Sequence, residues 1–164
     1  MKNTNPNILI NDKLLVTARV LEKAGNILFS QFNMTTRAYE ILIHIHAGKN
    51  TTVKLATMLQ SSLANITHKT KLLESHGYLK RMASDTDKRI WYFSLTPQGE
   101  KVLETIRFIY EKATEKLYSQ FSKQQKKQFL QFLSAVEEHL KGISENKKQI
   151  KQFVESLVKV KKNN

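Results

Sequence analysis

The most constraining feature of this chain is residues 87–99, Asp-Lys-Arg-Ile-Trp-Tyr-Phe-Ser-Leu-Thr-Pro-Gln-Gly. Within it, Trp91, Phe93 and Leu95 recur at the two-residue period of a strand with one buried face. The charged residues that precede them suit an exposed turn, and a second strand-like run lies just upstream. The sequence therefore predicts a β-hairpin, with strands over 78–82 and 90–95 and a polar loop over 83–89.

The same segment predicts a helix directly after the hairpin. Thr96 is placed as an N-cap, and Pro97 takes the first helical position, where its missing N–H costs no helical hydrogen bond. A basic hairpin that leads straight into a helix is typical of the wing of a winged helix-turn-helix. The residues upstream supply the pair of helices that such a wing needs.

Apolar residues at helical spacing account for most of the remaining chain, which holds only two prolines and five glycines. On the fourth expected helix, Ile66, Thr70 and Leu73 face inward. Gly48 and Gly77 fit the left-handed position that follows a last helical turn. We expect helices over 11–30, from Thr35 or Thr36 through Ile45, from Thr51 or Thr52 through Leu59, from Ser62 to Gly77, from Pro97 through Leu117, and after the Ser122–Gln125 capping box, with the pattern resuming at Ile150–Val158.

The predicted fold is mainly α: a winged helix-turn-helix over residues 35–99, between helical regions at residues 1–34 and 100–164, the second with a basic tail. The helices at both ends carry apolar faces that so small a central module cannot cover. Two chains that pack these ends together are the simplest solution, so we expect a homodimer with dimerisation helices at both ends.

The formal net charge of +13 favours an anionic polymer or membrane surface as partner, or else a lysine-rich solvated surface. The chain has no cysteine, which excludes disulfides and thiolate chemistry. No apolar run approaches the ~20 residues of a membrane span, and no signal-peptide pattern begins the sequence. We expect a cytoplasmic protein that does not bind membranes. It carries no catalytic or phosphate-loop motif, so we expect neither enzymatic activity nor a cofactor.

Three groups of residues share one pattern: Leu55-Ala56-Thr57-Met58-Leu59, Leu73-Glu74-Ser75-His76-Gly77-Tyr78-Leu79, and then Asp87, Arg89, Leu95, Thr96 and Gly99. Through this pattern, residues from Leu14 to Leu140 resemble the multiple-antibiotic-resistance-regulator (MarR) family of bacterial transcription factors. The resemblance implies a homodimer that binds double-stranded DNA, with the fourth helix in the major groove and the wing in the adjacent minor groove. Ser84 and Thr86 stand where the family often has acidic and basic residues, and the last twenty-odd residues extend past its usual end.

Residues at the start of the fourth helix are the candidates for base contacts. Asn65 can pair with adenine through two hydrogen bonds or merely order the helix start, and Leu63 or Ala64 can touch a thymine methyl. These residue types favour an A·T-rich site, and the expected homodimer favours a palindromic one. The predicted recognition residues are Ser61, Ser62, Leu63, Ala64, Asn65, Thr67, His68, Lys69 and Lys71.

The wing candidates are Asp87, Lys88 and Arg89. In the resembled family the acid matching Asp87 pairs with the base matching Arg89 and sets the shape of the wing. Lys88 is therefore the better candidate for a minor-groove contact.

A third set of residues has two interpretations. Aromatic side chains could line a pocket for a small aromatic or anionic effector, or could be ordinary core residues at helical spacing. The five histidines show no spacing typical of a metal site, and we expect none. The predicted pocket residues are Phe29, Phe32, Tyr39, Phe108 and Tyr110.

Two functions from different classes follow from the sequence. One is a sequence-specific transcriptional regulator, expected to be a repressor and released by an effector. The other is a winged-helix protein that associates with the nucleoid or with RNA and uses its charge without sequence choice. The ratio of specific to nonspecific affinity separates them.

Overall fold

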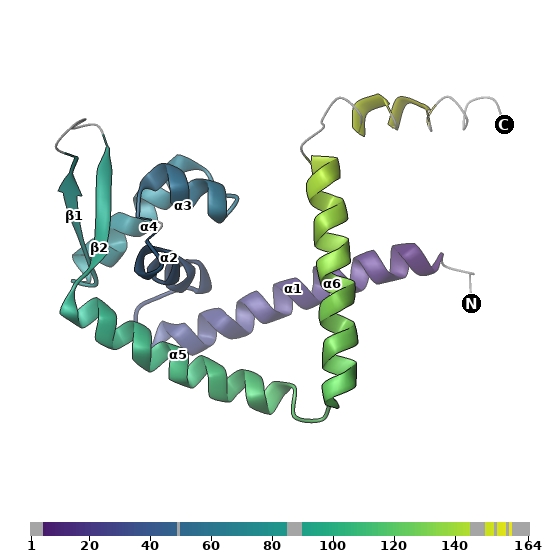
Figure 1. Ribbon diagram of the computed structural model, residues 1–164, viewed down its shortest axis with the longest axis horizontal. Helices are drawn as coiled ribbons and strands as arrows, with labels where there is room; N and C mark the ends of the chain where they lie inside the picture. The colour runs from purple at the N-terminus through teal and green to yellow at the C-terminus, as the bar shows by residue number, and fades with distance from the viewer. Residues whose placement is uncertain are drawn as a thin grey trace. The chain divides into compact units, whose positions relative to one another are not determined.

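The computed structural model of this chain describes residues 5–48, 50–84 and 90–144, together with 150–152, 154–156 and 158. Two compact units divide the chain, Met1–Ala113 and Thr114–Asn164, and each is described by itself. The elements, drawn in Figure 1, are α1 (Pro6–Ser30), α2 (Thr36–His46), α3 (Thr52–Met58), α4 (Leu63–Ser75), β1 (Leu79–Ala83), β2 (Trp91–Leu95), α5 (Pro97–Leu117) and α6 (Lys123–Ser144).

The predicted winged helix-turn-helix is confirmed. Thr35, Thr51 and Ser62 cap α2, α3 and α4, because each side-chain oxygen accepts a hydrogen bond from a backbone N–H of the first turn. Helix α1 begins earlier than the expected residue 11, since Asn5 caps it through the Asn7 N–H at 2.9 Å. Pro6 then stands at the first helical position, where proline is favoured.

The hairpin pairs β1 with β2 antiparallel, from Leu79 opposite Leu95 to Ala83 opposite Trp91. The predicted buried face holds only in part: Phe93 is buried, whereas Trp91, at the outer end of β2, is 40% exposed. A third chain segment joins the sheet edge, which the sequence did not indicate. Thr51 pairs with Tyr92, and the Phe93 N–H donates to the Asn50 carbonyl at 2.8 Å.

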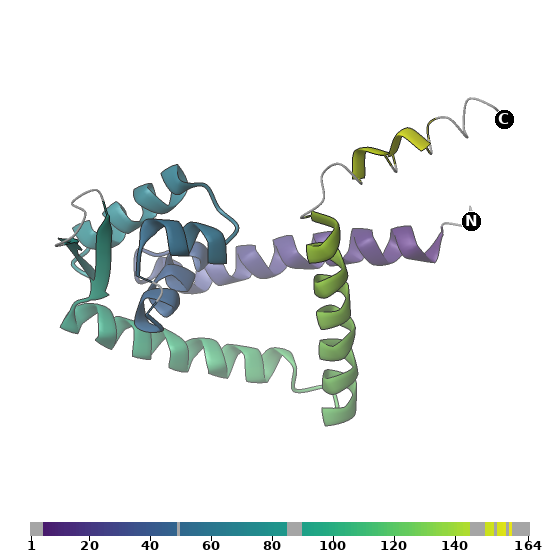
Figure 2. The ribbon, with the colours of Figure 1, turned by 45° about the horizontal axis from the view of Figure 1, so that its top comes forward.

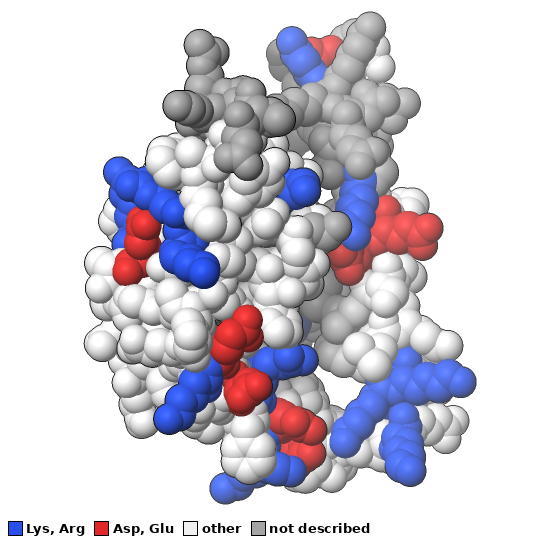
Figure 3. Space-filling model, turned by 60° about the vertical axis from the view of Figure 1, so that its left-hand side comes forward, with Lys and Arg blue, Asp and Glu red and all other residues white. Residues whose placement is uncertain are grey.

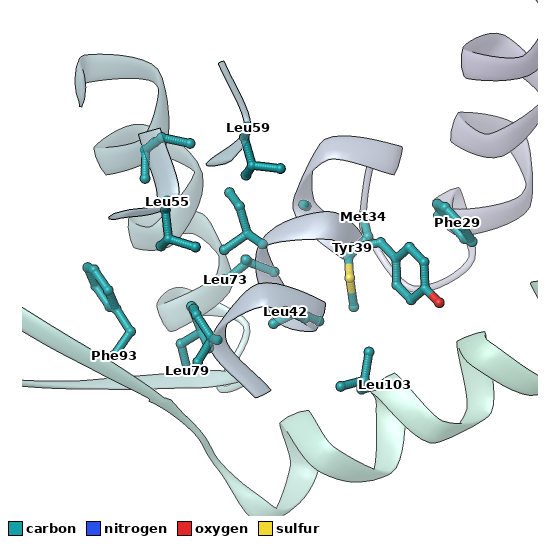
Figure 4. Packing of buried hydrophobic residues seen from close by; sticks show 14 of the residues in the cluster. Phe29, Met34, Tyr39, Leu42, Leu55, Leu59, Leu73, Leu79, Phe93 and Leu103 are labelled. Carbon is teal, nitrogen blue, oxygen red and sulfur yellow. The ribbon is translucent and has the colours of Figure 1, made fainter. Parts of the chain in front are cut away.

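The core of the first unit gathers side chains from helices and hairpin around α2 (Figure 4). Ile41 and Leu42 of α2 are fully buried at its centre. The predicted inward residues of α4 are buried as expected. Every buried hydrophobic residue of the described chain lies in this unit. Those that are fully buried, apart from the residues of α2, are Phe29, Leu55, Ile66, Leu73, Leu103 and Ile106.

Helix α1 meets the start of α2 closely at Gly25. The Thr36 N–H donates to the Asn26 side chain at 2.8 Å. A Cβ on Gly25 would lie 2.6 Å from the Thr36 hydroxyl, so a glycine that weakens the helix locally also permits this contact.

In the second unit, α6 begins at the predicted capping box. The Ser122 N–H donates to the Gln125 side chain at 2.9 Å, and the Gln125 N–H donates to the Ser122 hydroxyl at 3.2 Å. Its apolar residues Phe129, Leu130 and Leu140 are exposed. Among the described residues, no helix combines the length and the hydrophobicity needed to cross a bilayer.

A compact joint connects the end of α4, both strands and the start of α5. Gly77, at φ +72°, ends α4 in a Schellman motif in which the Tyr78 N–H donates to the Leu73 carbonyl at 3.0 Å. The Thr96 hydroxyl donates to the Gly77 carbonyl at 2.6 Å and accepts from the Gly99 N–H at 3.0 Å. A Cβ on Gly99 would overlap the Tyr78 carbonyl oxygen. Only glycine therefore allows α5 to start this close to β1.

We predict that Gly99→Ala lowers the free energy of unfolding by about 1–3 kcal/mol, because the added methyl group forces backbone apart. Urea denaturation followed by circular dichroism measures this change. Glu104→Ala, on the exposed side of the same helix, is the matched control and should change stability by less than about 0.5 kcal/mol. Equal effects of the two substitutions would contradict the close packing at Gly99.

Candidate nucleic-acid interface

The turn between α3 and α4 sets the direction of the candidate recognition helix. Gln60 adopts a left-handed conformation, φ +47°. The Ser61 N–H donates to the Ala56 carbonyl at 2.9 Å, and the Gln60 N–H donates to that of Thr57 at 3.3 Å. This is again a Schellman motif, here with glutamine where glycine is usual. The Arg37 guanidinium, which pairs with Glu40 at 2.8 Å, also donates to the Leu59 carbonyl at 3.3 Å.

Helix α4 is anchored through one face and exposes the other. Ile66, Thr70 and Leu73 are 0%, 2% and 1% exposed. The predicted recognition residues all avoid this buried stripe. Ser61 and Lys69 are half-buried, and the exposed ones are Ser62, Leu63, Ala64, Asn65, Thr67, His68 and Lys71.

Helical spacing ranks these exposed residues. Ala64, His68 and Lys71 follow one another at i, i+4 and i+7 and lie opposite the buried stripe. Asn65 and Thr67 lie on the two flanks of that outer face. Asn65, the main candidate for a base contact from the sequence, therefore lies beside the centre of the exposed face, which Ala64, His68 and Lys71 occupy.

Two candidate side chains are engaged within the helix start. The Asn65 amide donates to the Ser61 hydroxyl at 2.8 Å, and the Thr67 hydroxyl donates to the Leu63 carbonyl at 2.8 Å. The Asn65 carboxamide is thus oriented before any ligand arrives, while its exposed oxygen can still accept a hydrogen bond. Thr67 has used its one donor, and it presents a methyl group and an acceptor.

The wing lies beside α4, as the views of Figures 1 and 2 agree. The predicted wing residues Asp87, Lys88 and Arg89 lie outside the described residues. The described part of the hairpin contributes a residue that the sequence argument missed: Arg81, which lies 3.3 Å from Glu74 and over the ring of Trp91. The sequence feature that could have indicated Arg81 is the alternation of residues along the strand. That alternation assigns Arg81 to a face only once the register of the hairpin is known.

Charge is present but not concentrated. Residues 35–99 hold nine lysines and arginines against four acidic residues. On the face that Figure 3 shows, basic side chains form separate groups, and some of these groups have acidic side chains beside them. Charge alone therefore does not define the interface. The candidate interface is defined by the geometry of α4 and the hairpin.

The residues predicted for an effector pocket fall into two groups. Phe29, Tyr39 and Tyr110 form a cluster with ring centres 4.8 to 6.0 Å apart, whereas Phe108 is 62% exposed. Phe32 packs against the core. Burial raises the pKa of Tyr39 above its usual value, an effect that Arg107 partly opposes. This mutual packing favours the core interpretation for Phe29 and Tyr39, and the effector role stays a prediction.

His44 and His46 lie two residues apart on α2, and the other three histidines belong to other parts of the chain. His46 pairs with Glu100 at 3.1 Å and so connects the end of α2 to the start of α5. His68 is on α4 and His139 on α6, while His76 is the C-cap of α4. Across the part of the chain that the structure describes, no group of three or more His, Asp or Glu side chains is arranged to hold a metal ion.

Comparison with known proteins agrees with this geometry. The family model described as "MarR family" matches residues 34–91, which span α2, α3, α4 and most of the hairpin. These residues form a MarR-family domain. The match ends at the start of β2, so the helices on either side lie outside it.

Alignments with individual proteins extend the similarity beyond residues 34–91. The chain is 27% identical over 143 residues to YhbI of Bacillus subtilis, an uncharacterized HTH-type transcriptional regulator, covering 84% of this chain and 93% of that protein. It is 25% identical over 115 residues to the HTH-type transcriptional regulator BilQ of Clostridioides difficile, covering 70% and 78%. Among solved structures, the fold is similar to S. aureus MepR in a complex with DNA, at a TM-score of 0.73 and 20% identity, covering 80% of this chain and 97% of that one.

We predict that Gln60→Gly raises the free energy of unfolding by about 0.5–1 kcal/mol. Glycine removes the roughly 1–2 kcal/mol that a residue with a side chain costs in the left-handed backbone conformation. Part of this gain is lost because glycine makes the unfolded chain more flexible. Gln60→Ala keeps the strain and should leave stability nearly unchanged in the same urea titration. A stabilisation by alanine equal to that by glycine would contradict the role of the backbone conformation.

Proposed function

We propose that this protein is a DNA-binding transcriptional regulator that reads double-stranded DNA through α4. The observation that carries the proposal is the division of α4 into a buried stripe and an exposed face. Ile66, Thr70 and Leu73 fix the helix to the core, which leaves small and polar residues outward. A helix of this kind fits the major groove, and residues of its first turns reach base edges.

We further propose that the protein acts as a homodimer. On α1, Leu9, Val16, Val20 and Ile27 recur at the spacing of one helical face and are 51% to 65% exposed. So large a run of exposed apolar side chains is typical of an interface. A second copy of the chain that covers it would place two α4 helices on one duplex, on half-sites about one helical turn apart.

The expected operator is palindromic and A·T-rich. Its symmetry follows from that of the dimer, and its composition follows from Asn65 and from the apolar groups of Leu63 and Ala64, which suit adenine and thymine. Occupation of a promoter excludes other proteins from it, so repression is the simplest outcome. Release by a small aromatic or anionic effector completes the proposal, with the exposed aromatic side chains of Phe108 and Tyr110 as its contacts.

Selection of bound genomic fragments by the purified full chain tests this function. We expect a two-fold symmetric motif, an affinity at physiological salt at least ~10³ times that for random duplex, and a dimer by sedimentation equilibrium. A nonspecific nucleoid or RNA-associated protein, which the charge of +13 would also suit, should show no enriched motif. A monomer without duplex selectivity would overturn the proposal.

We predict that Asn65→Ala weakens binding to the selected operator by ~1–3 kcal/mol and relaxes the preference at one base position. The reason is loss of a bidentate contact from an amide that Ser61 already orients. Competition with operators substituted at each position measures the preference. Lys69→Ala is the control, since loss of a phosphate contact weakens all sequences alike. A uniform loss for Asn65→Ala would reject base contact by Asn65.

A further inference from the structure

One side chain joins the wing to α4. Arg81 is in the middle of β1, opposite Phe93 in the hairpin. Its Nε lies 3.3 Å from a carboxylate oxygen of Glu74, in the last turn of α4. The guanidinium carbon lies 4.8 Å from the centre of the Trp91 ring, on β2. Arg81 therefore contacts the candidate recognition helix and the second strand at the same time.

The register explains why this residue occupies that place. Strand alternation puts Leu79, Arg81 and Ala83 on one face of the hairpin. Their partners on the same face are Leu95, Phe93 and Trp91. Leu79 and Phe93 are buried at 3% and 6% exposed, whereas Trp91 is 40% exposed. Arg81 lies where the buried base of the hairpin gives way to its exposed outer part, so its contacts continue the packing beyond the core.

We propose that Arg81 is a positioning residue that fixes the wing relative to α4, acting through Glu74 and Trp91 rather than by touching DNA. This rests on the proposed function. The planar guanidinium can stack on an aromatic ring while an edge N–H meets a carboxylate, which a lysine ammonium does not reproduce. In the structure the guanidinium carbon lies over the Trp91 ring, and the Nε lies beside the Glu74 carboxylate.

The first test needs no DNA. Trp91 is the single tryptophan of the chain, so its fluorescence reports this contact directly. We expect Arg81→Lys and Glu74→Gln to increase quenching of Trp91 by acrylamide and to shift its emission. Lys80→Gln is the matched control, because Lys80 pairs with Ser94 and lies on the opposite face of the hairpin. Circular dichroism confirms that each variant is folded.

The second test uses the sign of the effect on operator binding. Glu74→Gln removes a negative charge, so electrostatics alone predicts tighter binding to DNA. Positioning predicts the reverse, about tenfold weaker binding, with the salt dependence unchanged. Glu104→Gln changes the net charge equally without touching the wing and should not weaken binding. Arg81→Lys, which keeps the charge, should lose about as much as Glu74→Gln, and the double variant no more than either alone.

Opposite results would overturn the proposal. Tighter binding by Glu74→Gln, or wild-type binding by Arg81→Lys, would show that Arg81 serves only as a charge. An Arg81→Gln variant whose salt slope falls by about one unit, with Trp91 quenching unchanged, would identify a direct phosphate contact. If the wild-type protein showed no duplex selectivity, the proposed function would be contradicted and not the role of Arg81. Quenching of Trp91 fluorescence would still decide whether Arg81 holds the wing.

Discussion

The structure of the first unit depends on one backbone approach, that of Gly99 to the carbonyl of Tyr78. Thr96 completes the joint by donating its hydroxyl to the Gly77 carbonyl and accepting the Gly99 N–H. Since Gly77 also ends α4, these few atoms connect the candidate recognition helix, both strands and the long helix α5. A side chain larger than hydrogen at Gly99 would move α5 away from β1 and so disturb the wing and the core together.

The N-terminal end of α4 is also fixed by a small number of hydrogen bonds. Helix α3 ends in a left-handed residue, Gln60, whose neighbours make the hydrogen bonds of a Schellman motif. Ser62 then caps α4, and the helix is held by a buried stripe instead of by its own propensity. Both ends of α4 are therefore fixed by backbone geometry, which leaves its outer side chains available for contact. Arg81 adds a side-chain connection between this helix and the wing, where the hydrophobic core no longer reaches.

Local features were predicted well because they are decided by neighbours in the chain. The helix start at Thr35 or Thr36, the cap at Thr96 and the capping box at Ser122 depend on residues within three positions. The sequence therefore contains all the information they need. The extent of burial was predicted less well. Trp91 was expected to share the buried face of Phe93, but the strand extends past the core there and the ring stays 40% exposed. Periodicity indicates which face a residue occupies, not how far the neighbouring elements extend.

The sequence by itself determined the order of the helices and the hairpin, the approximate bounds of most of them, and the assignment of the inward stripe of α4. Only the tertiary structure decided which of the outward residues lies at the centre of the exposed face. It also decided that Asn50 and Thr51 join the sheet edge, and that Arg81 meets both Glu74 and Trp91. These features unite residues far apart in the chain, and their positions follow from how helices and strands pack, which no local pattern of residues encodes.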